Sequence, residues 1–224
     1  MLSVLNQGGP VMYVLLAFSV AGLAILLLKL FEFSRLRLRR DDGCVAEAMT
    51  LAEDGDIAQA LKRLGESASP VARVLEATLQ GVSDDVPAAT LSAEIGRVGS
   101  REIRALESWL RALSSIGHLS PLLGLLGTVF GMIAAFQKIQ EAGSRVDASL
   151  LSGGIWEALL TTAFGLAVAI PAMAAFYLLE GEVDRARASM RDLSTRLLVR
   201  FEKVPGSVTQ GLEAARVETE NYGV

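Results

Sequence analysis

The chain has 224 residues, of which 51% are hydrophobic and 21% are charged, and its net charge is −4. This mixture disfavours an ordinary soluble domain and favours apolar segments in lipid joined to charged segments in water. The sequence contains no basic tract with interleaved aromatic residues, which would indicate nucleic-acid binding. The single His118 and the scattered carboxylates form no metal-binding pattern, and the lone Cys44 cannot form an internal disulfide. We therefore expect no metal and no other cofactor.

Three uncharged apolar stretches are long enough to cross a bilayer, at residues 11–28, 119–136 and 158–179. At about 1.5 Å per residue they cover roughly 27–33 Å, close to the thickness of a hydrocarbon core. We predict transmembrane helices at 11–31, 118–137 and 154–179. The first stretch has no preceding basic residues and no small-residue cleavage site, so we expect it to remain in the protein rather than act as a signal peptide.

The distribution of basic residues predicts the orientation. Residues 1–10 contain no lysine or arginine, whereas Lys29 and four arginines between positions 35 and 40 follow the first stretch. By the positive-inside rule the N-terminus lies outside and the C-terminus lies in the cytoplasm. The expected layout is an outer N-terminus at 1–10, a cytoplasmic helical domain at 32–117, an outer loop at 138–153, and a cytoplasmic C-terminal helix and tail at 180–224.

Short amphipathic helices are expected within residues 43–80. The segment Asp54-Gly55-Asp56 breaks one of them, and Asp56 is suited to cap a helix over 57–64. Residues 81–85 have the composition of a loop, and Pro87 fits the first turn of the helix that follows.

The second and third spans are expected to continue into the cytoplasm. No strong helix breaker separates Pro87 from the second span, and apolar residues recur there at spacings of three and four, from Ile95 to Trp109 and Leu113. We predict one helix that runs on into the second span, and a similar extension of the third span over 182–202. The residues after Pro205 are polar. The predicted fold class is an all-α membrane protein whose second and third transmembrane helices extend into a cytoplasmic helical bundle.

The second and third spans are rich in small residues, unlike the bulky first span. Gly127 and Gly131 form a small-xxx-small pair, and Gly124, Thr128 and Gly131 share one helix face. Small residues let helices approach closely in lipid, where packing drives association. We therefore expect both spans to pack against protein neighbours. The predicted packing residues are Gly124, Gly127, Gly131, Gly165 and Pro171.

Glu157 and three threonines are the informative polar groups in these spans. A carboxylate in a span costs about 2.5–3.5 kcal/mol by insertion scales, so it normally faces a partner or a wet cavity. Glu157 and Thr161 lie one turn apart, whereas Thr162 is about 140° from Glu157 and would reach a different edge of the same lumen. Hydroxyl groups both donate and accept hydrogen bonds, so Thr128 and Thr162 could hold a file of water molecules.

Structural readings of the same residues remain open. Glu157 lies near the end of its helix, where the helix dipole and interfacial water favour a carboxylate without a function. Each threonine could instead bond the carbonyl four residues earlier in its own helix. His118 fits a plain interfacial histidine better than a proton sensor. Trp156 and Tyr177 fit interfacial anchors.

Two segments resemble the hallmark stretches of the MotA/TolQ/ExbB proton-channel family. They read SPLLGLLGTVFGM at 120–132 and EALLTTAFGLAVAIPA at 157–172, and the opening QGGPVMYVLLAFSVAGLAILLLKLFEF is similar to the first span of ExbB-type members. The resemblance covers all three spans in order. Three spans with an outer N-terminus match ExbB and TolQ rather than MotA, which has four.

This resemblance implies a pentameric ring around a dimer of a single-span ExbD/TolR-like partner, whose membrane aspartate takes up and releases protons. It also implies a bacterial inner membrane, with the N-terminus in the periplasm. The family's pore-facing groups fall on Thr128, Glu157 and Thr162 of this chain; Thr161 is a weaker candidate, because members often have alanine there. Many members carry an asparagine where this chain has Tyr177-Leu178-Leu179, which leaves the branch open.

We expect, on these grounds, a stator subunit that couples the proton motive force to work in the cell envelope, such as energised outer-membrane transport. The alternatives are a non-conducting membrane scaffold and a sodium-driven stator. The sequence shows neither a nucleophile–base pair nor a phosphate-binding loop, so we do not expect an enzyme.

Overall fold

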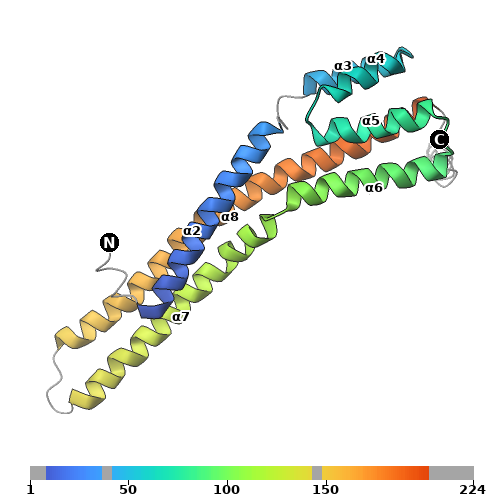
Figure 1. The fold of residues 1–224 in the computed structure, drawn as a ribbon. Coiled ribbons are helices and arrows are strands. Elements are labelled where there is room, and N and C mark those ends of the chain that lie inside the picture. The colour runs from blue at the N-terminus through green and yellow to red at the C-terminus, as the bar shows by residue number, and fades with distance from the viewer. Residues whose placement is uncertain (1–8, 37–41, 143–147, 202–224) are drawn as a thin grey trace, which may run out of the picture. The chain divides into compact units, whose positions relative to one another are not determined.

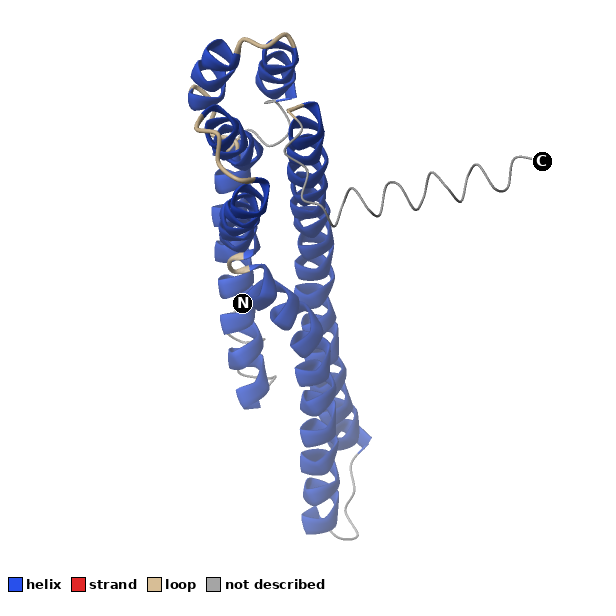
Figure 2. Ribbon diagram, turned by 90° about the vertical axis from the view of Figure 1, so that its right-hand side faces the viewer, coloured by secondary structure: helices blue, strands red, loops and turns tan. Residues whose placement is uncertain are grey.

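The computed structural model describes residues 9–36, 42–142 and 148–201, and it is built from helices. They are α2 (Gly9–Arg35), α3 (Asp42–Glu53), α4 (Ile57–Gly65), α5 (Pro70–Ser83), α6 (Ala88–Glu107), α7 (Leu110–Ala142) and α8 (Ala148–Arg200). Within those residues there is no strand (Figure 2). The predicted all-α class is confirmed.

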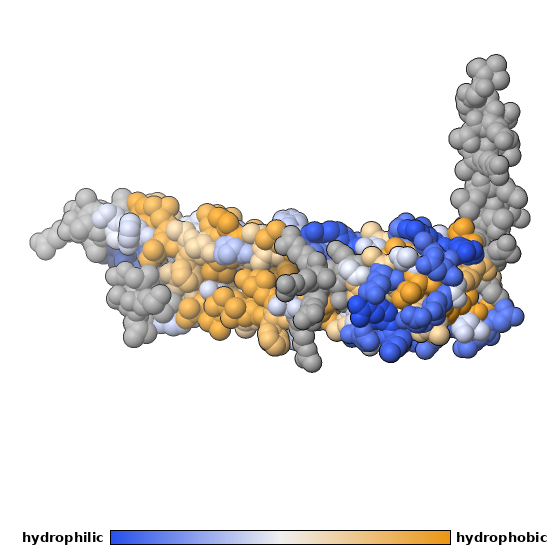
Figure 3. Space-filling view, turned by 90° about the horizontal axis from the view of Figure 1, so that it is seen from above, coloured by the Kyte–Doolittle hydropathy of each residue, from blue (hydrophilic) through white to orange (hydrophobic). Residues whose placement is uncertain are grey.

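The chain divides into two compact units, which we name by their composition. The membrane unit comprises residues 1–31 and 108–180, and the polar unit comprises residues 32–107 and 181–224. Three helical stretches, Gly9–Ser34, Ala88–Glu141 and Ser152–Arg200, each contain a run that is long and apolar enough to cross a membrane. One part of the surface is mostly apolar, and the other is mostly polar with scattered apolar patches (Figure 3). The protein is thus a multi-pass membrane protein, as predicted.

The membrane unit consists of α2, α7 and the first part of α8, which lie side by side (Figure 1). The helix α2 contacts the other two around a cavity of about 160 Å³. Its walls include Phe18 and Gly22 of α2, Ile116 of α7, and Val168 and Pro171 of α8. A Cβ atom added to Gly22 would lie 3.6 Å from Ile116 Cγ2, which is ordinary van der Waals contact.

The prediction of one unbroken helix from Pro87 into the second span is wrong. The helix α6 ends at Glu107, and α7 begins at Leu110. Between them Trp109 has φ +65°, in the left-handed region, and its side chain is 67% exposed rather than part of the apolar stripe. The left-handed conformation costs an L-residue about 1–2 kcal/mol. Nothing in the local sequence demands it, because residues 101–116 contain neither glycine nor proline.

The polar unit is formed by α3–α6 and the second part of α8. In it α3 packs on α4, α4 on α5, and α5 on α6. Two sequence predictions need correction here. The helix α5 continues through Ser83, so the expected loop at 81–85 is shorter, and Pro87 precedes α6 rather than lying in its first turn; its carbonyl accepts a hydrogen bond from the Leu91 N–H at 2.9 Å.

The predicted cap at Asp56 is confirmed. The Asp56 carboxylate accepts a hydrogen bond from the Gln59 backbone N–H at 3.1 Å, at the start of α4. Such caps contribute about 1 kcal/mol. We therefore expect Asp56→Ala to lower the free energy of unfolding by about 1 kcal/mol, and Asp56→Ser to lose much less, because a hydroxyl can replace the acceptor. Thermal unfolding followed by circular dichroism checks this; equal losses in the two variants would contradict it.

Some predictions fall on residues outside the described ranges. They include the arginines at 37, 39 and 40, residues 143–147 of the expected outer loop, and the tail after Pro205.

Candidate functional site

Small residues form the contact between α7 and α8. A Cβ atom added to Gly131 would lie 2.9 Å from Ala158 Cβ, and one added to Gly154 would lie 2.5 Å from Ala135 Cβ. A Cβ atom on Gly127 would collide with the side chain of Thr161. Close approach of this kind is what small residues permit between helices in lipid. The neighbour of these residues is therefore the other span of the same chain.

The two helix backbones approach each other closely at Gly124 and Gly165. A Cβ atom on Gly165 would lie 2.6 Å from the Ser120 carbonyl oxygen and 3.1 Å from Gly124 Cα. Both are backbone atoms, which cannot move aside as the end of a side chain can. Pro171 lies further along α8, where it lines the cavity beside α2 together with Leu113 and Ile116 of α7.

Thr162 and Thr128 are brought together at this close approach. The Thr162 hydroxyl donates to the Gly124 carbonyl across the two helices at 2.9 Å. Gly124 is the residue whose carbonyl accepts the Thr128 N–H in a regular α-helix. The Thr128 hydroxyl donates to the Leu125 carbonyl at 2.6 Å. The two threonines thus lie on either side of one peptide group. The Thr162 hydroxyl does not bond a carbonyl of its own helix, which was the structural alternative considered for it.

Thr161 has a local role instead. Its hydroxyl donates to the Glu157 carbonyl at 3.0 Å, four residues earlier, and its side chain is 1% exposed against Gly127. It therefore fills the contact between the two spans, and its hydroxyl satisfies its own helix.

The level of Glu157 follows from its neighbours. Ala158 packs against Gly131, so Glu157, one residue nearer the start of α8, lies level with position 132 of α7, whose apolar stretch continues four residues further, to Phe136. Four helical residues rise about 6 Å. The backbone of Glu157 thus lies within the length of that apolar stretch rather than at its end. The side chain is half-buried, and among the described residues it has no hydrogen-bond or ion-pair partner.

The structure does not place Glu157 on the same helix face as Thr162. Val168, eleven residues after Glu157, points within about 20° of it, and Val168 lines the cavity beside α2. Thr162 is turned about 140° away from Glu157. Within one chain, the carboxylate and the threonine pair therefore occupy opposite edges of the α7–α8 pair.

Sequence reasoning missed a buried cation in the first span. Lys29, counted above among the inward-flanking basic residues, is 1% exposed, and its Nζ donates to the Ser108 hydroxyl at 3.1 Å. Hydrogen bonds to charged groups contribute about 1.5–3 kcal/mol. The available signal was its position, since Lys29 lies between Leu28 and Leu30 rather than within the basic cluster.

The other polar candidates lie on the surface. The His118 ring is exposed, and its Nδ1 lies 2.8 Å from the Ser114 carbonyl oxygen of the preceding turn. Trp156 and Tyr177 are 64% and 60% exposed, as membrane anchors require. No cluster of three or more metal-ligating side chains occurs among the described residues.

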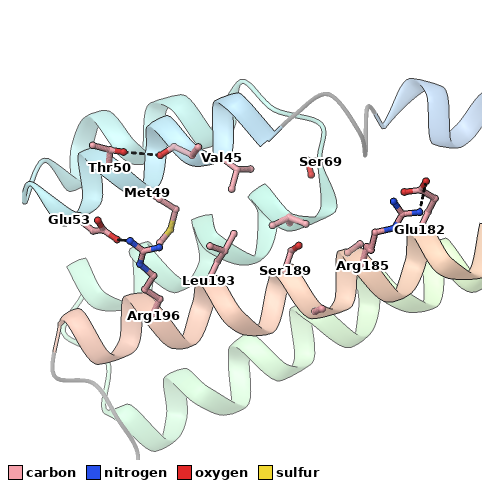
Figure 4. A pocket seen from close by; sticks show the side chains of 14 residues that line it. Val45, Met49, Thr50, Glu53, Ser69, Glu182, Arg185, Ser189, Leu193 and Arg196 are labelled. Carbon is pink, nitrogen blue, oxygen red and sulfur yellow. Dashed lines mark hydrogen bonds and ion pairs between the residues drawn. The ribbon is translucent and has the colours of Figure 1, made fainter.

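A groove of about 640 Å³ lies between α3 and α8 in the polar unit (Figure 4). Its floor includes Val45, Met49 and Leu193. Its two arginines have partners, since Arg196 pairs with Glu53 at 2.7 Å and Arg185 with Glu182 at 2.9 Å. Because both arginines are neutralised by glutamates, these groups do not indicate an ion-binding site.

Comparison with known proteins identifies the family of the chain. The model of the MotA/TolQ/ExbB proton channel family matches residues 66–192. The biopolymer transport protein ExbB of Salmonella typhimurium is 30% identical over 196 residues, which cover 84% of this chain and 79% of that protein. A putative ExbB homolog of Methanothermobacter thermautotrophicus is 29% identical over 82% of the chain, which spans 64% of that relative's length.

A further relative, matched over a shorter part of the chain, is a TolQ rather than an ExbB protein. The Tol-Pal system protein TolQ of Haemophilus influenzae is 36% identical over 101 residues, 44% of each chain. The family is named for proton channels, and the two ExbB relatives are named as biopolymer transport proteins. The matched family model covers more than half of the chain and includes both the α7–α8 contact and Glu157. The chain belongs to the MotA/TolQ/ExbB proton channel family.

Proposed function

We propose that this protein is the proton-conducting stator subunit of an inner-membrane motor that does work in the cell envelope. The observation that carries the proposal is the position of Glu157, a half-buried residue whose backbone lies about 6 Å inside the end of the apolar stretch of the neighbouring helix. An ionisable group at such a level normally meets water or a partner. Thr162, which bonds the Gly124 carbonyl, and Thr128, which bonds the Leu125 carbonyl, supply hydroxyls for a water file at the other edge of the two helices.

One chain alone does not enclose a path. Glu157 and the threonine pair lie on opposite edges of α7 and α8, so neighbouring helices must complete any lumen that includes both. We propose a homo-oligomeric ring, a pentamer by family resemblance, around a dimer of an ExbD/TolR-like single-span partner with a membrane aspartate. The N-terminus would be periplasmic and the C-terminus cytoplasmic, as the basic residues after the first span favour. Native mass spectrometry of the extracted complex tests both subunit numbers.

The work performed is proposed to be energised transport, as the name "biopolymer transport protein" of the ExbB relatives suggests, and the family resemblance favours the outer membrane as its place. One proton that crosses 100 mV releases about 2.3 kcal/mol. A few protons therefore suffice to move a partner helix within the ring.

The test is proton flux through the complex with its single-span partner in liposomes. We expect Glu157→Gln and Thr162→Val each to reduce potential-driven proton entry by about tenfold or more, which is about 1.4 kcal/mol on the barrier. Thr161→Val should lose less, because its hydroxyl already bonds within its own helix.

Thr195→Val provides the matched control. Thr195 lies on α8 in the polar unit and donates to the Arg191 carbonyl at 2.7 Å, so its removal should leave the flux unchanged. If assembled complexes retain full flux with both Glu157→Gln and Thr162→Val, protons cross the complex without these groups. That result would favour a non-conducting scaffold role for this chain. Flux that follows a sodium gradient at constant pH would favour the sodium-driven stator.

A further inference from the structure

The start of α5 borders the groove between α3 and α8, and it has backbone donors without acceptors. The first backbone bond of this helix runs from the Arg73 N–H to the Ser69 carbonyl at 3.2 Å. The N–H groups of Val71 and Ala72 come before it, where a helix supplies no acceptor of its own, and no other described residue accepts from them. Both residues are buried, with exposed fractions of 9% and 0%. Buried donors without an acceptor are unfavourable, so their presence calls for a partner.

Ser69 occupies the position from which a side chain normally supplies that acceptor. Serine is favoured there because its hydroxyl accepts the N–H of the second or third helical residue. The Ser69 backbone is extended, with ψ 134°, but its side chain makes no capping bond. Its own N–H donates to the Ser67 hydroxyl at 3.0 Å. Ser69 is only 3% exposed, and its side chain lines the groove, as does Val71 (Figure 4). A buried hydroxyl without a partner therefore points into the groove beside the backbone donors.

This set of donors suits an anion. The start of a helix attracts negative charge, because the first N–H groups and the helix dipole both point toward it, and α5 is 14 residues long. Pro70, the first residue of α5, has no N–H, so the donors are the Ser69 hydroxyl and the N–H groups of Val71 and Ala72. A carboxylate offers about four lone-pair sites and can accept from all three.

The rest of the groove favours a single negative charge on an apolar body. The two arginines in its walls are each paired with a glutamate, as described above, so the charged side chains cancel. A phosphate group, with a charge of about −1.5 to −2 at pH 7, would therefore be poorly balanced. Val45, Met49 and Leu193 give the groove an apolar floor. Its volume of about 640 Å³ lies within the range of about 300–1,000 Å³ that is usual for small-molecule sites.

We propose that the groove is a binding site for an amphiphilic carboxylate of the fatty-acid class. The carboxylate accepts hydrogen bonds from Ser69, Val71 and Ala72 at the start of α5, and the apolar chain lies over Met49 and Leu193. All of these residues belong to the polar unit. The inference goes beyond the proposed function and does not rest on proton conduction.

The Val71 amide reports directly on this site. Proline labelled with ¹³C at the carbonyl and valine labelled with ¹⁵N together select valine amides that follow a proline, and the sequence has two of these, Val11 and Val71. The full-length chain in lipid nanodiscs is titrated with octanoate and followed by nuclear magnetic resonance. We expect a saturable shift of the Val71 amide. The Val11 amide, at the start of the first span, reports on unspecific entry of octanoate into the bilayer.

Octanol is the matched ligand control, because it has the same apolar chain without the carboxylate. Hydrogen bonds to charged groups are stronger than those to neutral ones, so we expect octanol to bind about tenfold more weakly or worse.

Ser69→Asp is the decisive variant. Its carboxylate would accept from the Val71 and Ala72 N–H groups itself. We therefore expect octanoate to bind about tenfold more weakly or worse, while the thermal midpoint rises. Ser69→Ala removes one of three donors and should weaken binding by about threefold. Ser100→Asp adds the same charge at an exposed position of α6, away from the groove, and should leave binding unchanged.

Three results would overturn the proposal. One is a Val71 amide that octanoate does not move, which would show that solvent alone meets the donors. Another is equal binding of octanoate and octanol. The third is full octanoate binding by Ser69→Asp, with helicity retained by circular dichroism. Because the titration needs no partner subunit and no proton gradient, its failure is distinct from failure of the proposed function.

Discussion

Gly165→Ala is expected to cause one of the largest losses of stability in the membrane unit. The new Cβ atom would lie 2.6 Å from the Ser120 carbonyl oxygen and 3.3 Å from the Gly124 nitrogen. Because these are backbone atoms, α7 and α8 must separate, and separation also weakens the bond from Thr162 to the Gly124 carbonyl. Overpacking of this kind costs about 1–3 kcal/mol. In a chain of this size that lowers the thermal midpoint by about 3–10 °C.

Gly153→Ala is the matched control. Gly153 lies on the same helix, and an added Cβ atom meets nothing within 4 Å. Alanine is favoured over glycine within a helix by about 1 kcal/mol, so this variant should unfold at the parent temperature or slightly above. Differential scanning fluorimetry of the detergent-solubilised chain measures both variants. A Gly165→Ala chain as stable as the Gly153→Ala chain would show that the two backbones do not approach as described.

Glu102→Ala is expected to produce the largest loss in the polar unit. The Glu102 side chain is 5% exposed and pairs with Arg73 of α5 at 2.6 Å and with Arg101 at 3.1 Å. Its removal leaves two cations without their partner and a gap between α5 and α6. Both guanidinium groups are more than one-third exposed, so solvent screens them. We expect a cost of about 1–2 kcal/mol, and about tenfold faster amide hydrogen exchange in α5 and α6 with little change in α7.

Glu94→Ala serves as the comparison for Glu102. Glu94 pairs with Arg97 at 2.5 Å on the exposed surface of α6. A hydrogen bond from Arg97 lowers the pKa of the Glu94 carboxyl, so the pair stabilises the ionised form, and its contribution disappears as the pH falls through that lowered pKa. Exposed pairs of this kind contribute little. Exchange in α5 and α6 should therefore match the parent at pH 7; acceleration equal to that of Glu102→Ala would contradict a special role for the buried carboxylate.

The sequence was sufficient for the features that depend on short-range patterns. Three apolar stretches of bilayer length predicted the spans, and Asp56 predicted a cap, because its side chain bonds the backbone three residues away. The small residues of α7 and α8 predicted a close contact. The sequence could not predict which helix these small residues pack against, since Gly131 could contact Ala158 of the same chain or a residue of another subunit equally well.

Features that depend on distant contacts escaped prediction. The break at Trp109 contradicts the local helix preference, and Lys29, which contacts Ser108 there, is 79 residues away in the sequence. The Thr162 bond to Gly124 joins positions 38 residues apart. No periodicity encodes such pairings, because they depend on how three helices are registered against one another.

The helix α8 runs for 53 residues from Ala148 to Arg200, which corresponds to about 80 Å. Insertion of a single residue between Val183 and Ala186, within the polar unit, would rotate every later side chain by about 100° relative to Val183, and would turn the apolar positions Ala186 and Met190 away from the core that buries them. Seven inserted residues would nearly restore the original direction, because they complete about two turns. Length variation in this helix among related chains should therefore occur in steps of whole turns.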